Sequence, residues 1–235
     1  MTAPSGWCGT TRAGPGRTSY GRLLTAAVSN FFSPGGLCHT VMVTFAPLPA
    51  TACWRHRGAR SGFEVAYFQA GPGGWQMDGT TVAAEDDHTW IVSYRIQLDP
   101  AWLTREARVT ARTTAGLRET VLASDGQGHW RVDGRAAAHL DGCPDVDLES
   151  SALTNTLPVH RLGLAVGDRA DSPAAYVRAL DLGAGRLEQW YARLPDQGGS
   201  QRYRYAAPAF GFTGTLIYDE SGLVLDYPGI AVRAR

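Results

Sequence analysis

The sequence predicts an all-β protein, an antiparallel β-barrel or half-barrel of about a dozen short strands. From about residue 53 onward, apolar and polar residues alternate in short runs, which is the period of a strand with one buried face. Gly, Asp and Pro separate these runs at close intervals, as turns between antiparallel strands require. The only candidate helical stretch is short and lies near residues 148–156.

The alternation locates the individual strands. In the clearest run, residues 90–99, Tyr94 and Ile96 share one face, whereas Arg95 lies on the other. The same reasoning predicts strands over 63–68, 74–84, 90–99, 105–114, 117–124, 129–132, 174–182, 187–194, 202–206, 209–218 and 223–227.

Two internal similarities favour a fold of two similar halves. Residues 94–99 resemble residues 176–181, and the expected turns 125–128 and 219–222 each begin with Asp and end with Gly. In such turns Asp accepts hydrogen bonds from nearby backbone N–H groups, and Gly adopts positive φ. Two halves closing on each other would form one barrel with a central cavity; chance similarity between short strands is the alternative.

The start of the chain has a different composition. Residues 1–41 contain three arginines and no acid, and they show neither helical nor strand periodicity. We expect residues 1–50 to be a disordered or mis-annotated extension, with Met42 as an alternative start, and residues 51–235 to form a single β-barrel domain. An Arg-rich, acid-poor segment is also typical of a transit peptide, so that alternative stays open.

Composition excludes several classes of protein. The 22 basic and 22 acidic residues cancel, which argues against binding nucleic acid through its phosphates. No run approaches 18 apolar residues, so we expect no stable membrane insertion. The four cysteines include no CxxC pair, which argues against a zinc framework or a dense disulfide scaffold and fits a cytoplasmic location. We expect no cofactor and no metal; the oligomeric state is not predictable from these patterns.

Polar chemistry concentrates between residues 142 and 162. If the chain is extended from Cys143 to Asp147, then Cys143, Asp145 and Asp147 lie on one face. This arrangement has three functional interpretations. Cys143 would be a nucleophile with His160 as its base, the two aspartates would act as a pair in acid–base catalysis, or they would form half of a metal site.

Two non-catalytic interpretations of the same segment stand beside these. Asn155 and the two aspartates would anchor a polar ligand, or they would hydrogen-bond to the backbone of an irregular loop while Arg161 pairs with a carboxylate. We expect the structural role for Arg161. Asn155 and Pro158 are expected where the chain leaves a strand and turns.

Aromatic residues form a second group, which either fills the core or lines a cavity for lipid tails or sugar rings. Its members are Trp90, Tyr94, Trp102, Trp130, Trp190, Tyr191, Tyr203, Tyr205, Phe210, Phe212, Tyr218 and Tyr227.

Several of these motifs, taken in order, resemble the putative glycolipid-binding family, a set of small bacterial proteins formerly classed as a domain of unknown function. The segments that carry the resemblance are Gly-Cys-x-Asp-Val-Asp at 142–147, Asn-Thr-Leu-Pro at 155–158 followed by Arg161-Leu162, and Gly-Leu-Val-Leu-Asp-Tyr-Pro-Gly at 222–229. The resemblance covers about residues 53–235 and leaves the first 50 unmatched.

The resemblance implies a fold similar to bacterial lipoprotein carriers and a lipid or glycolipid partner. It brings no established catalytic residues, so we expect a binding protein that holds a hydrophobic ligand in a β-barrel cavity. The alternative is a hydrolase of a lipid-like or sugar-like substrate that uses Cys143 or the Asp145/Asp147 pair. The expected ligand-binding residues are Tyr94, Arg95, Trp130, Asp145, Asp147, Asn155, Arg161, Tyr191, Tyr203, Tyr205, Asp226 and Tyr227.

Overall fold

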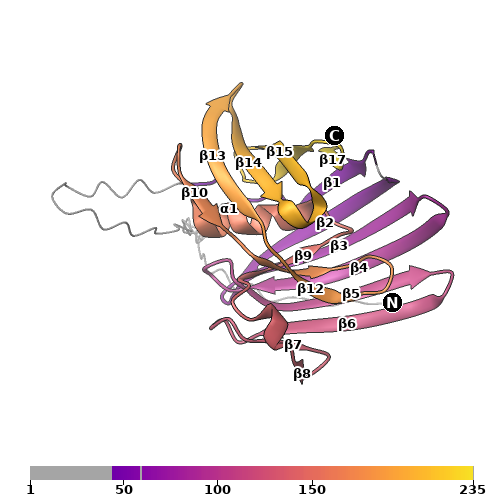
Figure 1. Ribbon diagram of the computed structural model, residues 1–235. Coiled ribbons are helices and arrows are strands. Elements are labelled where there is room, and N and C mark those ends of the chain that lie inside the picture. Colours follow the sequence, from indigo (N-terminus) through magenta and orange to yellow (C-terminus); the bar gives the residue numbers. More distant parts are fainter. Residues whose placement is uncertain (1–43, 59, 235) are drawn as a thin grey trace, which may run out of the picture.

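Two antiparallel meanders make up most of the computed structural model, which describes residues 44–58 and 60–234 (Figure 1). The first meander runs through eight consecutive strands: β1 (Thr51–His56), β2 (Ser61–Gly71), β3 (Gly74–Glu85), β4 (His88–Leu98), β5 (Thr104–Thr113), β6 (Gly116–Ser124), β7 (Trp130–Val132) and β8 (Arg135–Ala136). The second contains β13 (Trp190–Gln197), β14 (Ser200–Ala207), β15 (Phe212–Tyr218), β16 (Val224–Tyr227) and β17 (Ala231–Arg233).

Pairing between β17 and β1 joins the two meanders into one sheet, and β10 (Arg169–Asp171), which pairs with β13, completes its 14 strands. The all-β prediction is therefore confirmed. β10 and β8 stand at the two ends of the strand order and do not pair with each other, so the described residues form no closed barrel, and the prediction of a barrel or half-barrel is not confirmed.

The chain between the meanders leaves this sheet. It forms a second, three-stranded sheet from β9 (Asp145–Leu148), β11 (Ala174–Val177) and β12 (Ala184–Leu187), in which β9 and β11 run parallel. It also contains the helix α1 (Thr156–Leu162) and the short 3₁₀ turns η1 (Ala138–Leu140) and η2 (Leu153–Asn155); a third, η3 (Pro208–Phe210), links β14 to β15. We call residues 137–189 the inner segment.

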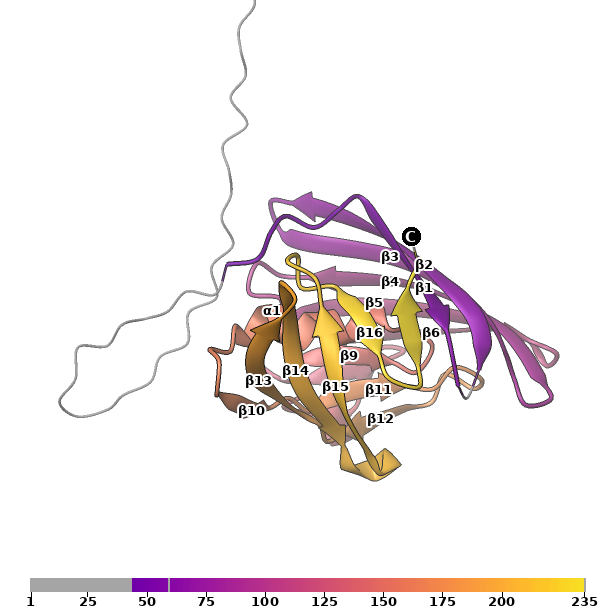
Figure 2. The same ribbon diagram turned by 90° about the horizontal axis from the view of Figure 1, so that it is seen from above.

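The inner segment lies between the two meanders, as both views show for α1 and β9 (Figure 2). On one side Thr81 of β3 donates a hydrogen bond to the carbonyl of Ser150, and on the other Tyr218 of β15 donates to the carbonyl of Asn155. Two apolar clusters follow this division, one packed mainly against the first meander and one mainly against the second. The protein's own chain therefore occupies the space where we expected a ligand cavity.

α1 is a helix where we expected a turn. The predicted helical stretch near 148–156 contains the last residue of β9, a turn and the 3₁₀ turn η2, and the helix begins only at Thr156. Pro158 lies in its first turn, where the missing N–H has no helical partner to lose, and Gly163 ends it with φ of 52°. No helix in the described residues is long and apolar enough to cross a membrane.

Of the two internal similarities that suggested a duplication, the one between the turns is found in the structure and the one between the strand segments is not. Asp125 and Asp219 each accept backbone hydrogen bonds from the second and fourth residues after them, in the turns β6–β7 and β15–β16. The segment 94–99, however, belongs to β4 of the large sheet, whereas 176–181 begins in β11 of the small one. These two segments do not occupy equivalent places.

Residues 44–50 contact the fold, although we expected it to start at 51. The N–H of Ala46 donates to the carbonyl of Glu220 at 2.9 Å, and the carbonyl of Ala50 accepts from Phe68. The ring of Phe45 lies 4.1 Å from that of His160. The expectations for residues 1–43, including an alternative start at Met42, fall outside the described residues.

Candidate functional site

β9 carries two aspartates into the interior between the meanders. The strand pairs in parallel with β11, with Asp145 opposite Ala174 and Asp147 opposite Tyr176. The extended conformation predicted for this segment is thus found. Both carboxylates are buried, with exposed fractions of 1% for Asp145 and 8% for Asp147. Burying a carboxylate is costly unless partners compensate, and the two residues differ in their partners.

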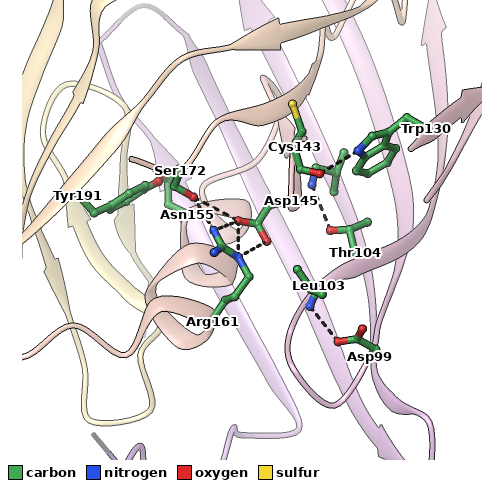
Figure 3. Close-up of polar contacts among 11 residues, drawn as sticks. Asp99, Leu103, Thr104, Trp130, Cys143, Asp145, Asn155, Arg161, Ser172 and Tyr191 are labelled. Carbon is green, nitrogen blue, oxygen red and sulfur yellow. Dashed lines mark hydrogen bonds and ion pairs between the residues drawn. The ribbon is translucent and has the colours of Figure 1, made fainter. Parts of the chain in front are cut away.

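Asp145 has a full set of partners (Figure 3). Arg161, in the last turn of α1, donates from Nε at 3.1 Å to each carboxylate oxygen and from Nη2 at 2.7 Å to Oδ2. The same Nη2 donates to the hydroxyl of Ser172 at 2.6 Å. Burial raises the pKa of Asp145, and the adjacent Arg161 charge opposes that effect. This pair fastens α1 to β9 and is the structural pairing expected for Arg161.

Asp147 has no cationic partner among the described residues. Its Oδ1 accepts a hydrogen bond from Thr154 Oγ1 at 2.7 Å. Burial raises its pKa to about 6, which this hydrogen bond offsets only in part, and the negative charge of Asp145 raises it further. A carboxylate can accept more hydrogen bonds than Asp147 receives here. A buried carboxylate with a raised pKa and no cationic partner is a candidate for a functional site.

Tyrosine hydroxyls surround Asp147 from the side of the second meander. Tyr191 donates to Asn155 Oδ1 at 2.9 Å, and Tyr205 donates to Gln189 Oε1 at 2.8 Å. Burial, followed by the charge of Asp147, raises the pKa of Tyr205. Because each hydroxyl proton is already donated, the oxygens of Tyr191 and Tyr205 can take part in further hydrogen bonds only as acceptors.

Four aromatic rings extend this cluster to the surface. Tyr176 and Phe210 lie 5.3 Å apart between ring centres, and Phe212 and Tyr227 lie 5.5 Å apart in an edge-to-face arrangement. Phe210 is 58% exposed and the other three are partly buried. We call Tyr176, Phe210, Phe212 and Tyr227 the aromatic rim.

Cys143 and His160 do not form a catalytic pair. Cys143 Sγ lies 3.5 Å from Nη1 of Arg186, and burial raises its thiol pKa to about 11. His160 is stacked on Trp102 at 3.7 Å, and its Nε2 lies 2.9 Å from the carbonyl of Ser221. Burial lowers the pKa of His160 to about 3, so it is neutral at physiological pH. A neutral thiol without a base is a poor nucleophile.

Five predicted site residues lie apart from this cluster. Tyr94 donates to Glu64 on the inner face of the first meander, and Trp130 Nε1 donates to the carbonyl of Cys143. Arg95 pairs with Asp78 on the outer face. The remaining two are the buried Tyr203, which lies under the guanidinium of Arg193, and the exposed Asp226.

The structure also reveals a buried acid that the sequence argument missed. Glu64 is fully buried and accepts hydrogen bonds from Tyr94, from the hydroxyl of Ser151 and from the N–H of Ala152. It fastens the inner segment to β2. Its neighbours Phe63 and Val65 are more apolar than Glu64, so alternation alone points Glu64 outward, which is the wrong face. No group of three or more His, Cys, Asp or Glu residues in the described part of the chain is arranged to hold a metal ion.

Comparison with known proteins gives two matches. The model of a family described as "Putative glycolipid-binding" matches residues 51–233. The crystal structure of a DUF1089 family protein from Pseudomonas aeruginosa, at 1.80 Å resolution, shares 31% sequence identity with this chain. The two structures align with a TM-score of 0.65 over 88% of this chain and 100% of that one. No curated protein matches the chain.

Proposed function

The chain belongs to the putative glycolipid-binding family, and from that premise we propose that it binds a glycolipid whose sugar headgroup is held at Asp147. The observation that supports this most directly is a buried carboxylate with no cation among the described residues, set among tyrosine oxygens that act as acceptors. Such a site favours a ligand that donates several hydrogen bonds and carries no negative charge, and a sugar with free hydroxyl groups meets both conditions.

The aromatic rim supports the same assignment. Sugar rings present apolar C–H faces, which stack on aromatic side chains while their hydroxyl groups turn to polar partners. Tyr176 and Phe210 would contact the sugar face, and Asp147 would accept from its hydroxyls. Because the inner segment fills the space between the meanders, the lipid tails would leave the headgroup along the surface.

This proposal gives the predicted site residues different roles. Asp147, Tyr191, Tyr205 and Tyr227 would contact or flank the headgroup. Asn155 would act through Tyr191, whose hydroxyl it orients, and Asp145 with Arg161 would hold β9 and α1 in place. Arg95, on the outer face, has no part in it.

The test is binding of a single-chain glycolipid mimic to the full-length protein. We expect octyl glucoside, below its micellar concentration, to bind in titration calorimetry more tightly than octyl phosphocholine, which has the same tail and no sugar. Asp147→Asn should weaken octyl glucoside binding by roughly tenfold, since hydrogen bonds to a charged acceptor contribute about 1.5–3 kcal/mol.

The matched control is Asp171→Asn, which changes an exposed aspartate on β10. It should bind octyl glucoside like the unmodified protein. Equal binding of the two mimics, or unchanged binding by Asp147→Asn, would contradict the proposal. Native mass spectrometry of the purified protein adds an independent readout, because a retained glycolipid reveals its own mass.

A further inference from the structure

The outer face of the first meander carries a row of exposed apolar side chains that the site does not use. Phe63 on β2, Val82 on β3 and Ile91 on β4 are direct cross-strand neighbours. Their exposed fractions are 37%, 46% and 41%. The same line continues through Arg112 on β5 to Leu117 on β6, which is 63% exposed. On the other side of Phe63, β1 contributes Arg55. We call these six residues the outer row.

The orientation of β2 makes this row unusual. One face of that strand carries Phe63, Val65 and Tyr67, and the other carries Glu64, Ala66 and Phe68. Packing by hydrophobicity alone would bury the first set and expose the acid. The structure does the reverse, because Glu64 is held inside by Tyr94 and the inner segment. The apolar residues left outside have no partner among the described residues, and clustered exposed apolar side chains typically mark an interaction surface.

A cleft lies along the same strands. It has a volume of about 600 Å³, and its lining includes Val82, Ile91, Thr89, Thr114 and Arg112. The cleft therefore combines the apolar side chains of Val82 and Ile91 with the cationic side chain of Arg112. A cleft of this size accommodates part of a lipid molecule.

The charges of the outer row have one sign. Arg55 and Arg112 are both exposed, and neither forms an ion pair within the described part of the chain. The parallel row next to it contains one acid, Glu119, which pairs with Arg108 at 2.7 Å. The other acids at this end of the sheet lie beyond the last residues of the row: Glu85, the last residue of β3, pairs with Arg60, and Asp86 and Asp87 are in the exposed turn between β3 and β4. The row is thus complementary to an anionic surface.

The outer row and the candidate site lie at the same end of the sheet. Tyr227 of the aromatic rim is opposite Ala231, Ala231 is opposite His56, and His56 is opposite Gly62. These residues form a line across the inner face. His56 directly follows Arg55 in the chain, and Gly62 directly precedes Phe63. On β1 and β2, this line and the outer row therefore occupy adjacent positions on opposite faces of the sheet. A surface that covers the outer row would also be near the aromatic rim.

We propose that the outer row docks this protein on an anionic lipid bilayer. Phe63, Val82 and Ile91 enter the headgroup region, and Arg55 and Arg112 pair with anionic headgroups. The inference rests on the proposed function, since a protein that takes up a glycolipid must meet the bilayer that contains it. A second copy of the chain fits the row less well, because two-fold pairing of such rows brings arginines towards arginines.

The experiment measures co-sedimentation of the full-length protein with vesicles that contain no glycolipid. We expect binding to vesicles of phosphatidylcholine with about one quarter phosphatidylglycerol, little binding to phosphatidylcholine alone, and loss of binding at high salt. Val82→Thr combined with Ile91→Thr keeps the β-branched shape and should reduce binding at least about fivefold. Arg55→Gln combined with Arg112→Gln should reduce it by a similar factor.

The controls change equally exposed residues elsewhere. Leu180→Thr and Arg204→Gln should bind vesicles like the unmodified protein. Melting temperatures of all variants verify folding. Equal binding to both kinds of vesicle, or outer-row variants that bind normally, would overturn the proposal. So would a dimer, formed without vesicles and abolished by Val82→Thr combined with Ile91→Thr, because the row would then be a protein interface.

The two proposals fail separately. Outer-row variants should retain octyl glucoside binding in solution, whereas Asp147→Asn should retain vesicle docking and lose octyl glucoside binding. If glucoside binding is absent and docking survives with its dependence on the outer row, the outer row is a membrane contact whatever the ligand. If docking is absent and glucoside binding survives, only the docking proposal is wrong.

Discussion

Asp145 and Asp147 are two residues apart on one short strand, yet their surroundings give them different roles. Asp145 has a bidentate arginine and a serine, as a structural ion pair requires. Asp147 has one threonine hydroxyl and a raised pKa. The sequence places both on one face and does not distinguish them, because Arg161 reaches β9 only through the position of α1.

Asp147→Asn is expected to stabilise the protein. The folded-state pKa of about 6 lies above the ordinary value of 3.8, so the carboxylate binds its proton more tightly in the folded state. Stability is therefore lost as pH rises from about 4 to about 6, and above that range the cost is roughly 2–3 kcal/mol. Urea unfolding near pH 7.5 should show that the Asp147→Asn variant has a larger free energy of unfolding than the unmodified protein, by roughly 2–3 kcal/mol. The difference should vanish near pH 4. A less stable variant at pH 7.5 would make Asp147 a structural residue.

Arg161→Ala is expected to destabilise strongly. The Asp145 carboxylate is almost fully buried, so removing its partner leaves an uncompensated charge, at a cost of roughly 3–5 kcal/mol. Asp145→Ala should cost a similar amount, and the double variant little more than either, when measured by urea unfolding. Arg178→Ala is the matched control, because Arg178 and Asp181 form a solvent-exposed pair and its removal should leave stability nearly unchanged. Additive losses would mean that the buried pair is not coupled.

At the scale of single elements, α1 shows what local patterns leave out. A helix of seven residues is too short to be stable alone, so its existence depends on packing. His160 supplies much of that packing, since its ring lies between Phe45 and Trp102. Trp102 itself has φ of 66°, an uncommon conformation for a bulky residue that the surrounding contacts must maintain. None of these partners is near α1 in the sequence.

The segment 44–50 is expected to contribute to stability through Phe45. Phe45→Ala removes one of the two rings that hold His160, and the partly buried side chain should cost about 1–2 kcal/mol in the free energy of unfolding. Val166→Ala, at an exposed apolar residue, should change stability by less than about 0.5 kcal/mol. Urea unfolding of both variants tests this. An unchanged Phe45→Ala variant would mean that the first contacts of the described chain are incidental.

For the whole molecule, alternation predicted strands β2 to β7 of the first meander well, because pairing there is between neighbours in the chain, and it missed β1 and β8. It did not predict the open 14-stranded sheet, which depends on the distant pair β1–β17, or the small sheet, which depends on the pair β9–β11. A barrel with a ligand cavity and an open sheet that packs around its own inner segment give the same alternation of apolar and polar residues in their strands. For the site, Tyr191 and Tyr205 lie by Asp147, whereas Tyr94 lies by Glu64, an acid whose inward orientation the pattern hides.

The pairing of β1 with β17 also affects how the chain folds during synthesis. Trp54 of β1 lies opposite Arg233 of β17. β1 is therefore synthesised early, but the strand it pairs with is synthesised last. Hairpins such as β2–β3 can form early, but the junction of the two meanders waits for the end of translation. Until then the edge of β1 is unpaired and open to wrong strands, the situation in which chaperones protect nascent β proteins. We expect refolding in vitro to be slow and prone to aggregation for the same reason.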